Sequence, residues 1–370
     1  MMKKFFLKYW PRLDWIITVS VLLLAGMGLL SLYSSSIGEG DFINFQKQLI
    51  FLAVGIFLMF LISSLDYRIL RNDPHLILIL YIFCLLALAG LFFFAPEIRN
   101  VQRWYKLGPV HVGPIEFTKL VLIILLAKYF SMRHVEMYRL KHIFLSGFYV
   151  LIPALLVFFQ PDLGSVLVLV FVWLVILLMS GIKLKVFLLL ALCGILIFVL
   201  AWPFLLKDYQ KERIITFYNS IVFPEQADVQ KAGWSQNQAK IAIGSAGFLG
   251  QGFSQGSQTQ YGFLPEPQTD FIFSAVAEEF GFLAVMVMAI LFSLLVWRII
   301  KIAAASQTNF IRLFALGFAT LITIQVFINI GMNLGLLPVM GIPLPFISYG
   351  GSSLIAFFIG AGIIQSMRHA

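Results

Sequence analysis

The amino-acid sequence predicts an all-α, polytopic membrane protein with about ten transmembrane helices. Hydrophobic residues make up 61% of the 370 residues and charged residues 12%, and the mean hydropathy is +0.95. This composition excludes a soluble globular domain. Apolar runs recur from Trp15 to Met367, and each is close to the roughly 20 residues that a helix needs to cross a hydrocarbon core of about 30 Å. The runs are continuously apolar, whereas a transmembrane barrel would need alternating segments of about ten residues.

The predicted spans follow one another through short connections, with one long exception. They cover residues 14–36, 46–65, 75–95, 114–131, 142–160, 163–181, 184–206, 271–299, 310–334 and 346–367. A large loop, residues 207–270, separates the seventh span from the eighth and is rich in Gly, Gln and Ser. It is predicted to contain a short amphipathic helix over 234–245 and, being long, to serve a function. We predict a single membrane domain over 1–370 that includes this loop.

The positions of Lys and Arg predict the orientation. One alternating set of connections is basic and contains Lys3, Lys4, Lys8, Arg12, Arg68, Arg71, Arg133, Arg139, Lys141, Lys183, Lys185, Arg298, Lys301, Arg312 and Arg368. This face and both termini are predicted to be cytoplasmic, and the loop 207–270 extracytoplasmic. The net charge of +9 then reflects topology and anionic headgroups, not nucleic-acid binding. The first apolar run has no small-residue cleavage site, so we predict a retained helix.

The two cysteines, Cys84 and Cys193, both lie within predicted spans. Neither a disulfide framework nor a cysteine metal site is indicated. Both are interpreted as small apolar side chains.

The most informative polar stretch lies where the long loop enters the eighth span. Asp270 stands at this junction, and Glu278 and Glu279 lie two turns further along. An ionisable group at membrane depth costs a few kcal/mol unless it is paired, hydrated or used, so Asp270 is the first candidate for chemistry. Ser274, one turn from Asp270, is expected to line the same cavity. The alternatives are that Asp270 only caps the helix, and that Glu278 and Glu279 are structural anchors.

A second polar group lies on the same predicted face. Arg103 precedes the fourth span, and Glu116 and Lys119 lie three residues apart at the start of that span, where they can neutralise each other. With the helix N-terminus, these groups suit an anionic ligand. The alternative is an ion pair between spans, with Arg103 on lipid headgroups. Asp162, after a proline, either bonds its own turn or joins the charged groups.

Several motifs in order along the chain resemble the SEDS (shape, elongation, division, sporulation) family of cell-wall proteins. They are Gln160-Pro-Asp-Leu-Gly164, Ala242-Ile-Gly-Ser-Ala-Gly247, Leu264-Pro-Glu266, Thr269-Asp-Phe-Ile-Phe273, Ala277-Glu-Glu279, Gly335-Leu-Leu-Pro338 and Ser348-Tyr-Gly-Gly-Ser352. The resemblance covers essentially the whole chain. Within the family, the short N-terminus and Gly341-Ile-Pro-Leu-Pro345 resemble the rod-shape elongation branch more than the division branch.

The resemblance implies a peptidoglycan glycosyltransferase that polymerises lipid II into glycan strands on the outer face of the bacterial cytoplasmic (inner) membrane. It implies an inverting transfer with Asp270 as general base. Arg103, Lys119 and Lys240 would bring positive charge to the lipid-linked pyrophosphate, and Glu266 would orient Asp270 or help bind a cation. Glu116 and Asp162 complete the expected substrate-binding residues.

The resemblance also implies partners and leaves rivals open. The expected partners are lipid II, the glycan linked to undecaprenyl pyrophosphate, membrane lipids and a class B penicillin-binding protein. A divalent cation, Mg²⁺ or Mn²⁺, is compatible with this chemistry, and its protein ligands stay unassigned. Two alternatives from other classes are a lipid II flippase and a noncatalytic scaffold of the cell-wall machinery. The clustering of charged groups toward one face favours the enzyme over the flippase.

Overall fold

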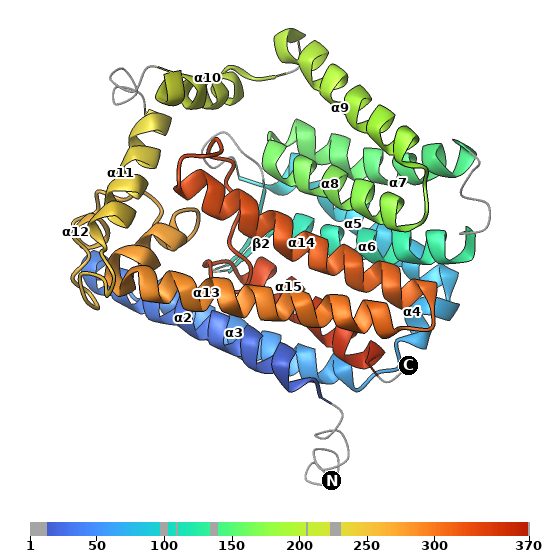
Figure 1. The fold of residues 1–370 in the computed structure, drawn as a ribbon, viewed down its shortest axis with the longest axis horizontal. Coiled ribbons are helices and arrows are strands. Elements are labelled where there is room, and N and C mark those ends of the chain that lie inside the picture. The colour runs from blue at the N-terminus through green and yellow to red at the C-terminus, as the bar shows by residue number, and fades with distance from the viewer. Residues whose placement is uncertain are drawn as a thin grey trace.

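A computed structural model describes residues 13–96, 103–108, 110–133, 140–204, 206–222 and 231–368. Each predicted span corresponds to one helical segment, interrupted only in the eighth among the described residues, so the all-α polytopic architecture is confirmed (Figure 1). These helices are α2 Trp15–Glu39, α3 Ile43–Ser63, α5 Pro74–Phe94, α6 Pro114–Arg133, α7 Leu140–Phe159, α8 Leu163–Met179, α9 Leu184–Phe204, α13 Ile272–Ala305, α14 Asn309–Asn333 and α15 Gly351–Met367. A short α4, Arg68–Asn72, precedes α5.

Most of these helices are apolar enough to cross a membrane. Among the described residues, 6 helices meet both the length and the hydropathy expected of a span, and three shorter apolar helices accompany them. Helix α6 is the exception because it carries charged side chains. It lies inside the bundle, packed by α5, α8, α14 and α15, and its residues 118–127 are all buried. A charge on α6 therefore meets protein and not lipid.

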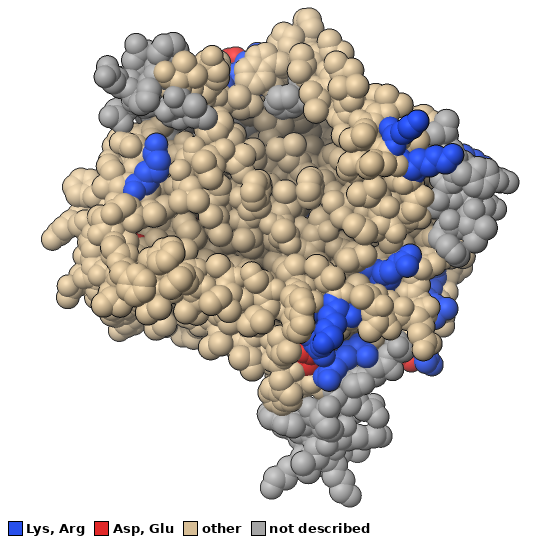
Figure 2. Space-filling view, in the orientation of Figure 1, with Lys and Arg blue, Asp and Glu red and all other residues tan. Residues whose placement is uncertain are grey.

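Figure 1 shows the helices lying side by side, with α2 and α3 along one edge of the bundle and α9 and α10 along the opposite edge. In Figure 2, Lys and Arg gather mainly at the end where α4 and the C-terminus lie, and the end over α11 and α12 carries few of them. The described basic residues on this face therefore gather mainly at one end of the bundle. The basic residues at 3–12 and Arg139 lie outside the described residues.

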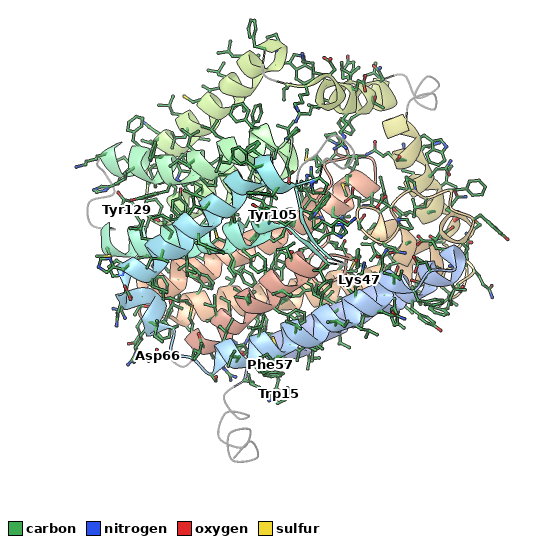
Figure 3. The ribbon with its side chains drawn as sticks, turned by 180° about the vertical axis from the view of Figure 1, so that it is seen from behind. Trp15, Lys47, Phe57, Asp66, Tyr105 and Tyr129 are labelled. Atoms are coloured by element: carbon green, nitrogen blue, oxygen red, sulfur yellow. The ribbon has the colours of Figure 1, made fainter. Side chains whose placement is uncertain are left out.

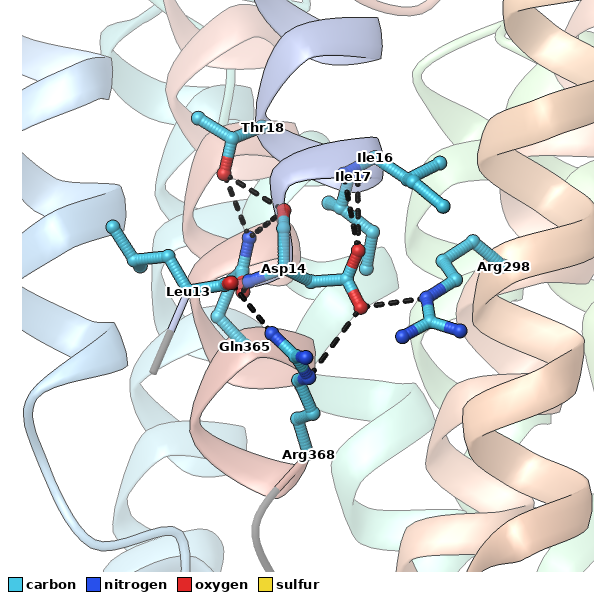
Figure 4. Close-up of polar contacts among 8 residues, drawn as sticks. All are labelled: Leu13, Asp14, Ile16, Ile17, Thr18, Arg298, Gln365 and Arg368. Atoms are coloured by element: carbon cyan, nitrogen blue, oxygen red, sulfur yellow. Dashed lines mark hydrogen bonds and ion pairs between the residues drawn. The ribbon is translucent and has the colours of Figure 1, made fainter. Parts of the chain in front are cut away.

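A polar cluster ties three helices together at the basic end of the bundle (Figure 4). Asp14, 2% exposed, caps α2 by accepting hydrogen bonds from the Ile16 and Ile17 amides at 3.2 and 3.4 Å. Its Oδ2 lies 2.6 Å from Arg298 Nε and 3.6 Å from Arg368 Nε. The side chain of Gln365 exchanges two hydrogen bonds with the Asp14 backbone, at 2.7 and 3.1 Å. The sequence analysis used Arg298 and Arg368 only to predict which face is cytoplasmic. In the structure they also join α13 and α15 to α2.

Asp14→Asn is expected to lower the free energy of unfolding by about 1–2 kcal/mol. Asn keeps the helix cap, so the change isolates the charge lost beside two arginines. Breaking a buried pair costs up to about 3–5 kcal/mol, and the partial exposure of Arg298 and Arg368, 19% and 31%, reduces this value. Thermal unfolding in detergent micelles measures the loss. Asp73→Asn is the matched control, since exposed Asp73 caps α5 in the same way; equal losses for both would contradict the prediction.

The long loop is more ordered than the sequence predicts. The expected helix at 234–245 is α11, Lys231–Ser245. The loop also contains α10, Asp208–Val222, and the short α12, Ser257–Gln260, neither of which was predicted. Figure 1 places α11 and α12 at the end of the bundle opposite the C-terminus.

The eighth predicted span is not one continuous helix. Gly281, at φ 72° and ψ −171°, interrupts α13, so Asp270, Glu278 and Glu279 all precede the membrane helix proper. The interruption is bridged by the loop before α12. The amides of Gln251 and Gly252 donate to the Glu278 and Glu279 carbonyls at 2.9 and 3.0 Å, and the Phe282 and Leu283 amides donate to the Gly247 and Phe248 carbonyls, both at 3.1 Å. The loop thus supplies the backbone partners that an unbroken helix would have provided.

Gly281→Ala is expected to destabilise the protein by at least about 3 kcal/mol. A positive φ is strained for any side chain, and a Cβ at Gly281 would lie 2.3 Å from the Gly250 backbone nitrogen. The melting temperature of the purified protein measures this effect. The control is Gly26→Ala in α2, where a Cβ meets nothing within 4 Å and where helical Ala gains about 0.5–1 kcal/mol. A variant of Gly281 that melts like the wild type would show that the backbone break is dispensable.

A small antiparallel hairpin precedes α6 and positions Arg103. Its strands are β1, Tyr105–Leu107, and β2, Val110–Val112, with Tyr105 opposite Val112. The Tyr105 hydroxyl donates to the Ala87 carbonyl at 2.7 Å, which fixes the hairpin beside α5 (Figure 3). Burial raises the pKa of Tyr105, so the phenol stays a neutral donor.

Candidate active site

Asp270 lies in a compact turn immediately before α13. The Glu266 carbonyl accepts hydrogen bonds from the Thr269 and Phe271 amides, both at 3.2 Å, and the Asp270 carbonyl accepts from two buried asparagines of α14, Asn329 at 3.1 Å and Asn333 at 3.0 Å. The N-cap residue of α13 is Phe271, whose side chain makes no capping hydrogen bond, so Asp270 lies one residue before the N-cap position.

The segment between α14 and α15, residues 338–350, packs directly on this turn. The Ser348 hydroxyl donates to the Thr269 carbonyl at 2.7 Å, and the Tyr349 amide donates to the Gln268 carbonyl at 2.8 Å. Asn329 Nδ2 also donates to the Ile342 carbonyl at 2.8 Å. One buried amide thus holds both segments at a fixed separation.

The side chains of Asp270 and Arg103 both lie beside Gly341. A Cβ at this glycine would lie 3.1 Å from Arg103 Nη1 and 3.6 Å from Asp270 Oδ2. Gly341 has a φ of +67°, so a side chain here would be strained and would enter the space beside both charged groups. Arg103 Nη1 donates to the Gly341 carbonyl at 3.3 Å. Asp270 and Arg103, predicted separately from the sequence, are therefore close together.

Arg103 is held on its other side by Asp162, at 3.1 Å from Nη2 to Oδ1, and their side chains are 14% and 4% exposed. Asp162 also caps α8, accepting from the Ser165 amide at 3.0 Å and the Ser165 hydroxyl at 2.8 Å. Both readings of Asp162 thus hold, since it bonds its own turn and joins the charged group. Arg103 Nε is buried and, among the described residues, has no hydrogen-bond partner.

Two further cations lie against residues 335 and 339, just before Gly341 in the sequence. Arg213 of α10 donates to the Val339 carbonyl at 3.2 Å, and Lys240 of α11 lies against Gly335, with its Nζ 3.6 Å from the position that a Cβ there would take. Lys240, Arg213 and Arg103 therefore follow one another along residues 335–341, and Asp270 lies at one end of the row. Such a row suits an extended anion with more than one charged group.

Glu116 and Lys119 form the predicted pair inside α6. Lys119 Nζ lies 2.8 Å from Glu116 Oε1, and Lys119 is 2% exposed. Glu116 lines a narrow crevice with Leu120, Phe318, Leu321, Ala356 and Phe357. The structure thus confirms the pairing of Glu116 with Lys119 on one face of α6.

The other polar groups of α13 are structural. Glu278 accepts from the Gln258 and Thr259 amides at 2.7 and 3.0 Å and so caps α12. Glu279 accepts from Ser34 of α2 and from Gln260. The structural alternative is correct for both glutamates.

Ser274 does not line a cavity as predicted. It is fully buried and donates to Asn333 Oδ1 at 2.6 Å. Asn333 also donates to the Asp270 carbonyl. Ser274 therefore helps to hold the Asp270 backbone in place through Asn333. Glu266, at φ 49°, accepts a hydrogen bond from the Thr269 hydroxyl at 3.2 Å and so braces the same turn.

Sequence reasoning missed Asn329, Asn333 and Gly341. A buried asparagine within an apolar run costs energy unless it is fully hydrogen-bonded, so the two asparagines four residues apart in α14 were the available signal. Arg213 was also not predicted as a site residue.

The fold and the site define a multi-pass membrane protein with an acid and a row of cations at one end of the bundle. The chain belongs to the FtsW/RodA/SpoVE family of cell cycle proteins, whose model matches residues 14–370, as the resemblance to SEDS proteins predicted. It is 34% identical over 367 residues to the peptidoglycan glycosyltransferase MrdB of Escherichia coli K12, covering 97% of this chain and 95% of the relative. It is also 34% identical to the stage V sporulation protein E of Bacillus subtilis 168, covering 96% of both chains.

Solved structures show the same fold. One, reported for the coordination of polymerization and crosslinking by a peptidoglycan synthase complex, superposes with a TM-score of 0.81 at 31% identity, covering 96% of this chain and 98% of that chain. The rod shape determining protein RodA of Thermus thermophilus superposes with a TM-score of 0.71 at 30% identity, covering 96% and 97%.

Proposed function

We propose that this chain is a peptidoglycan glycosyltransferase that polymerises lipid II into glycan strands. The observation that carries the proposal is the meeting of Asp270 and Arg103 at Gly341, in a chain similar over 97% of its length to a protein named for this activity. A carboxylate beside a row of cations supplies the two things that this transfer needs, a base and a site for a lipid-linked pyrophosphate.

Asp270 acts as the general base. The attacking sugar hydroxyl must lose its proton as it bonds to the anomeric carbon, and the bond from that carbon to the pyrophosphate oxygen breaks in the same step. An α-linked donor gives a β-linked product by this direct displacement, so one base suffices and no covalent glycosyl intermediate is needed. The backbone of Asp270 is fixed by Asn329 and Asn333, which keeps the carboxylate in one place.

The row of cations receives the departing pyrophosphate. Arg103, Arg213 and Lys240 lie along residues 335–341 and supply charge-assisted hydrogen bonds that strengthen as negative charge develops on the leaving group. Lys119, proposed from the sequence for this role, is buried on Glu116, so we assign it to positioning α6.

A divalent cation would act mainly through the substrate. Among the described residues, no group of three or more His, Cys, Asp or Glu side chains could hold a metal ion. Asp270 and Glu266, which lie in the same turn, are the carboxylates that we propose for this role, and pyrophosphate oxygens and water would provide the remaining ligands of Mg²⁺ or Mn²⁺. When bound, the ion would neutralise charge on the pyrophosphate.

We further propose the biological setting. The basic end of the bundle faces the cytoplasm and the Asp270 end faces outward. The motif Gly341-Ile-Pro-Leu-Pro345 favours a role in cell elongation over division. A class B penicillin-binding protein is the proposed partner, and the similarity to a chain of a peptidoglycan synthase complex supports this choice.

The test is lipid II polymerisation by the purified chain, with and without a class B penicillin-binding protein and with a titration of Mg²⁺ and Mn²⁺. Glycan strands separated by electrophoresis are the expected product. Transport of a fluorescent lipid II across vesicles without polymer would favour the flippase. Neither polymer nor transport under any condition would favour the scaffold.

A further inference from the structure

The loop over residues 246–253 has an unusual composition for an extramembrane segment. From Ile241 to Pro265 the chain contains no Asp, Glu, Lys or Arg. Phe248 and Leu249, at the tip of the loop, are 60% and 71% exposed, and Phe253 is 43% exposed. Exposed large apolar side chains without a nearby charge indicate a surface that is covered by something other than water.

Backbone hydrogen bonds tie loop 246–253 to α13 on both sides of its tip. Its carbonyls and amides pair with the interrupted turn of α13 through the four hydrogen bonds described above. Gly250, at φ +82°, approaches α13 so closely that a Cβ would lie 2.1 Å from the Glu279 carbonyl oxygen. Irregular backbone is tolerated at membrane depth where protein supplies its hydrogen bonds, and here α13 supplies partners for Gly247, Phe248, Gln251 and Gly252.

The depth of the loop follows from helix geometry. Arg298 lies at the basic end of the bundle, where it binds Asp14, and Phe282 precedes it by sixteen residues. A helix rises about 1.5 Å per residue, so Phe282 lies roughly 24 Å from Arg298, which is less than the hydrocarbon thickness of about 30 Å. Phe248, bonded to Leu283, is therefore within the depth of the acyl chains.

The tip of the loop continues the lipid-facing side of α13. The Phe248 and Phe282 rings lie 6.2 Å apart, and Phe282, Leu283, Val287 and Ile290 are all exposed along the helix. On the other side of the loop, Phe253 stacks on Tyr33 of α2 at 6.1 Å, an arrangement typical of aromatic side chains at a membrane interface.

We propose that loop 246–253 inserts into the bilayer and that Phe248 and Leu249 contact the acyl chains of membrane lipids. The apolar tip, the uncharged flanks, the backbone bonds to α13 and the continuity with the exposed face of α13 together favour lipid over a protein partner. The insertion fixes the depth of the polar turn that follows, because the same loop is bonded to α13 just after Asp270. This inference rests on the membrane orientation of the bundle and not on the proposed enzymatic activity.

The experiment is a measurement of spin-label depth in vesicles of phosphatidylethanolamine and phosphatidylglycerol, using the full chain with Cys84 and Cys193 replaced by Ala. Single labels are placed at Leu249→Cys and, separately, at Phe248→Cys. Ile290→Cys, 58% exposed on α13, is the lipid reference, and Glu212→Cys, exposed on α10, is the aqueous reference. Collision rates with oxygen and with a water-soluble nickel complex are compared.

Labels at 248 and 249 are expected to match Ile290, with an oxygen collision rate several-fold above that of nickel. A ratio like that of Glu212 would place the loop in water and overturn the proposal. Low collision rates with both reagents would show that protein covers the tip, which also overturns it. Because the measurement needs no lipid II, its failure is distinct from failure of the glycosyltransferase assay.

Discussion

Asp270→Asn is expected to lower the rate of lipid II polymerisation by about 10²–10⁴-fold, the usual contribution of a general base. Asn keeps the shape of the side chain but cannot accept the proton of the attacking hydroxyl. The Asp270 backbone carbonyl, which Asn329 and Asn333 hold, is unchanged, so the fold should be retained. The measurement is the initial rate of glycan formation at saturating lipid II, with the amount of folded protein matched by size-exclusion chromatography.

The control for Asp270→Asn is Asp41→Asn, which changes an exposed carboxylate whose side chain accepts from the Ile43 amide at 2.8 Å. Asn serves equally well in that position, so its polymerisation rate should equal that of the wild type. A polymerisation rate for Asp270→Asn within a few fold of wild type would show that another group takes the proton. Binding of lipid II to Asp270→Asn is expected to persist, because the row of cations at residues 335–341 is intact.

The sequence predicted the spans well because a run of about 20 apolar residues has few other solutions in a membrane. The same reasoning failed at Gly281, where α13 breaks. A single glycine in an apolar run does not reveal that the loop over residues 246–253, some thirty residues earlier, will replace the missing hydrogen bonds. Glycine is also frequent in unbroken transmembrane helices. The break could be inferred only from a contact between distant segments.

The site was predicted in part. Asp270 and Arg103 were chosen because charged groups near a membrane surface need a reason to be there, and the structure brings them together at Gly341. Spacing along one helix also predicted the pair of Glu116 and Lys119 correctly. Whether a cation faces a substrate or a neighbouring carboxylate depends on tertiary packing, which local spacing does not contain.

The role of the buried asparagines can be separated from general stability. Asn329→Leu keeps the branched outline of the side chain but removes the donor to the Ile342 carbonyl, while Asn333 still serves the Asp270 carbonyl. A buried carbonyl left without a partner costs about 1–3 kcal/mol, so the melting temperature should fall. The larger effect is expected on turnover, which should fall about 10–100-fold, because small misplacements of reacting groups slow a reaction strongly. Asn329 sets the distance between the turn that holds Asp270 and the segment that contacts Arg103.

Gln325→Leu provides the matched control for Asn329→Leu on the same helix. Gln325 is fully buried, and neither atom of its amide has a hydrogen-bond partner within the described part of the chain. Removing such an amide should leave stability unchanged or raise it, with normal turnover. If Asn329→Leu lowers the melting temperature while the folded fraction polymerises at the wild-type rate, the asparagine is only structural. A selective loss of kcat with unchanged KM would instead show that Asn329 positions the base without contacting the substrate, since ground-state binding is then preserved.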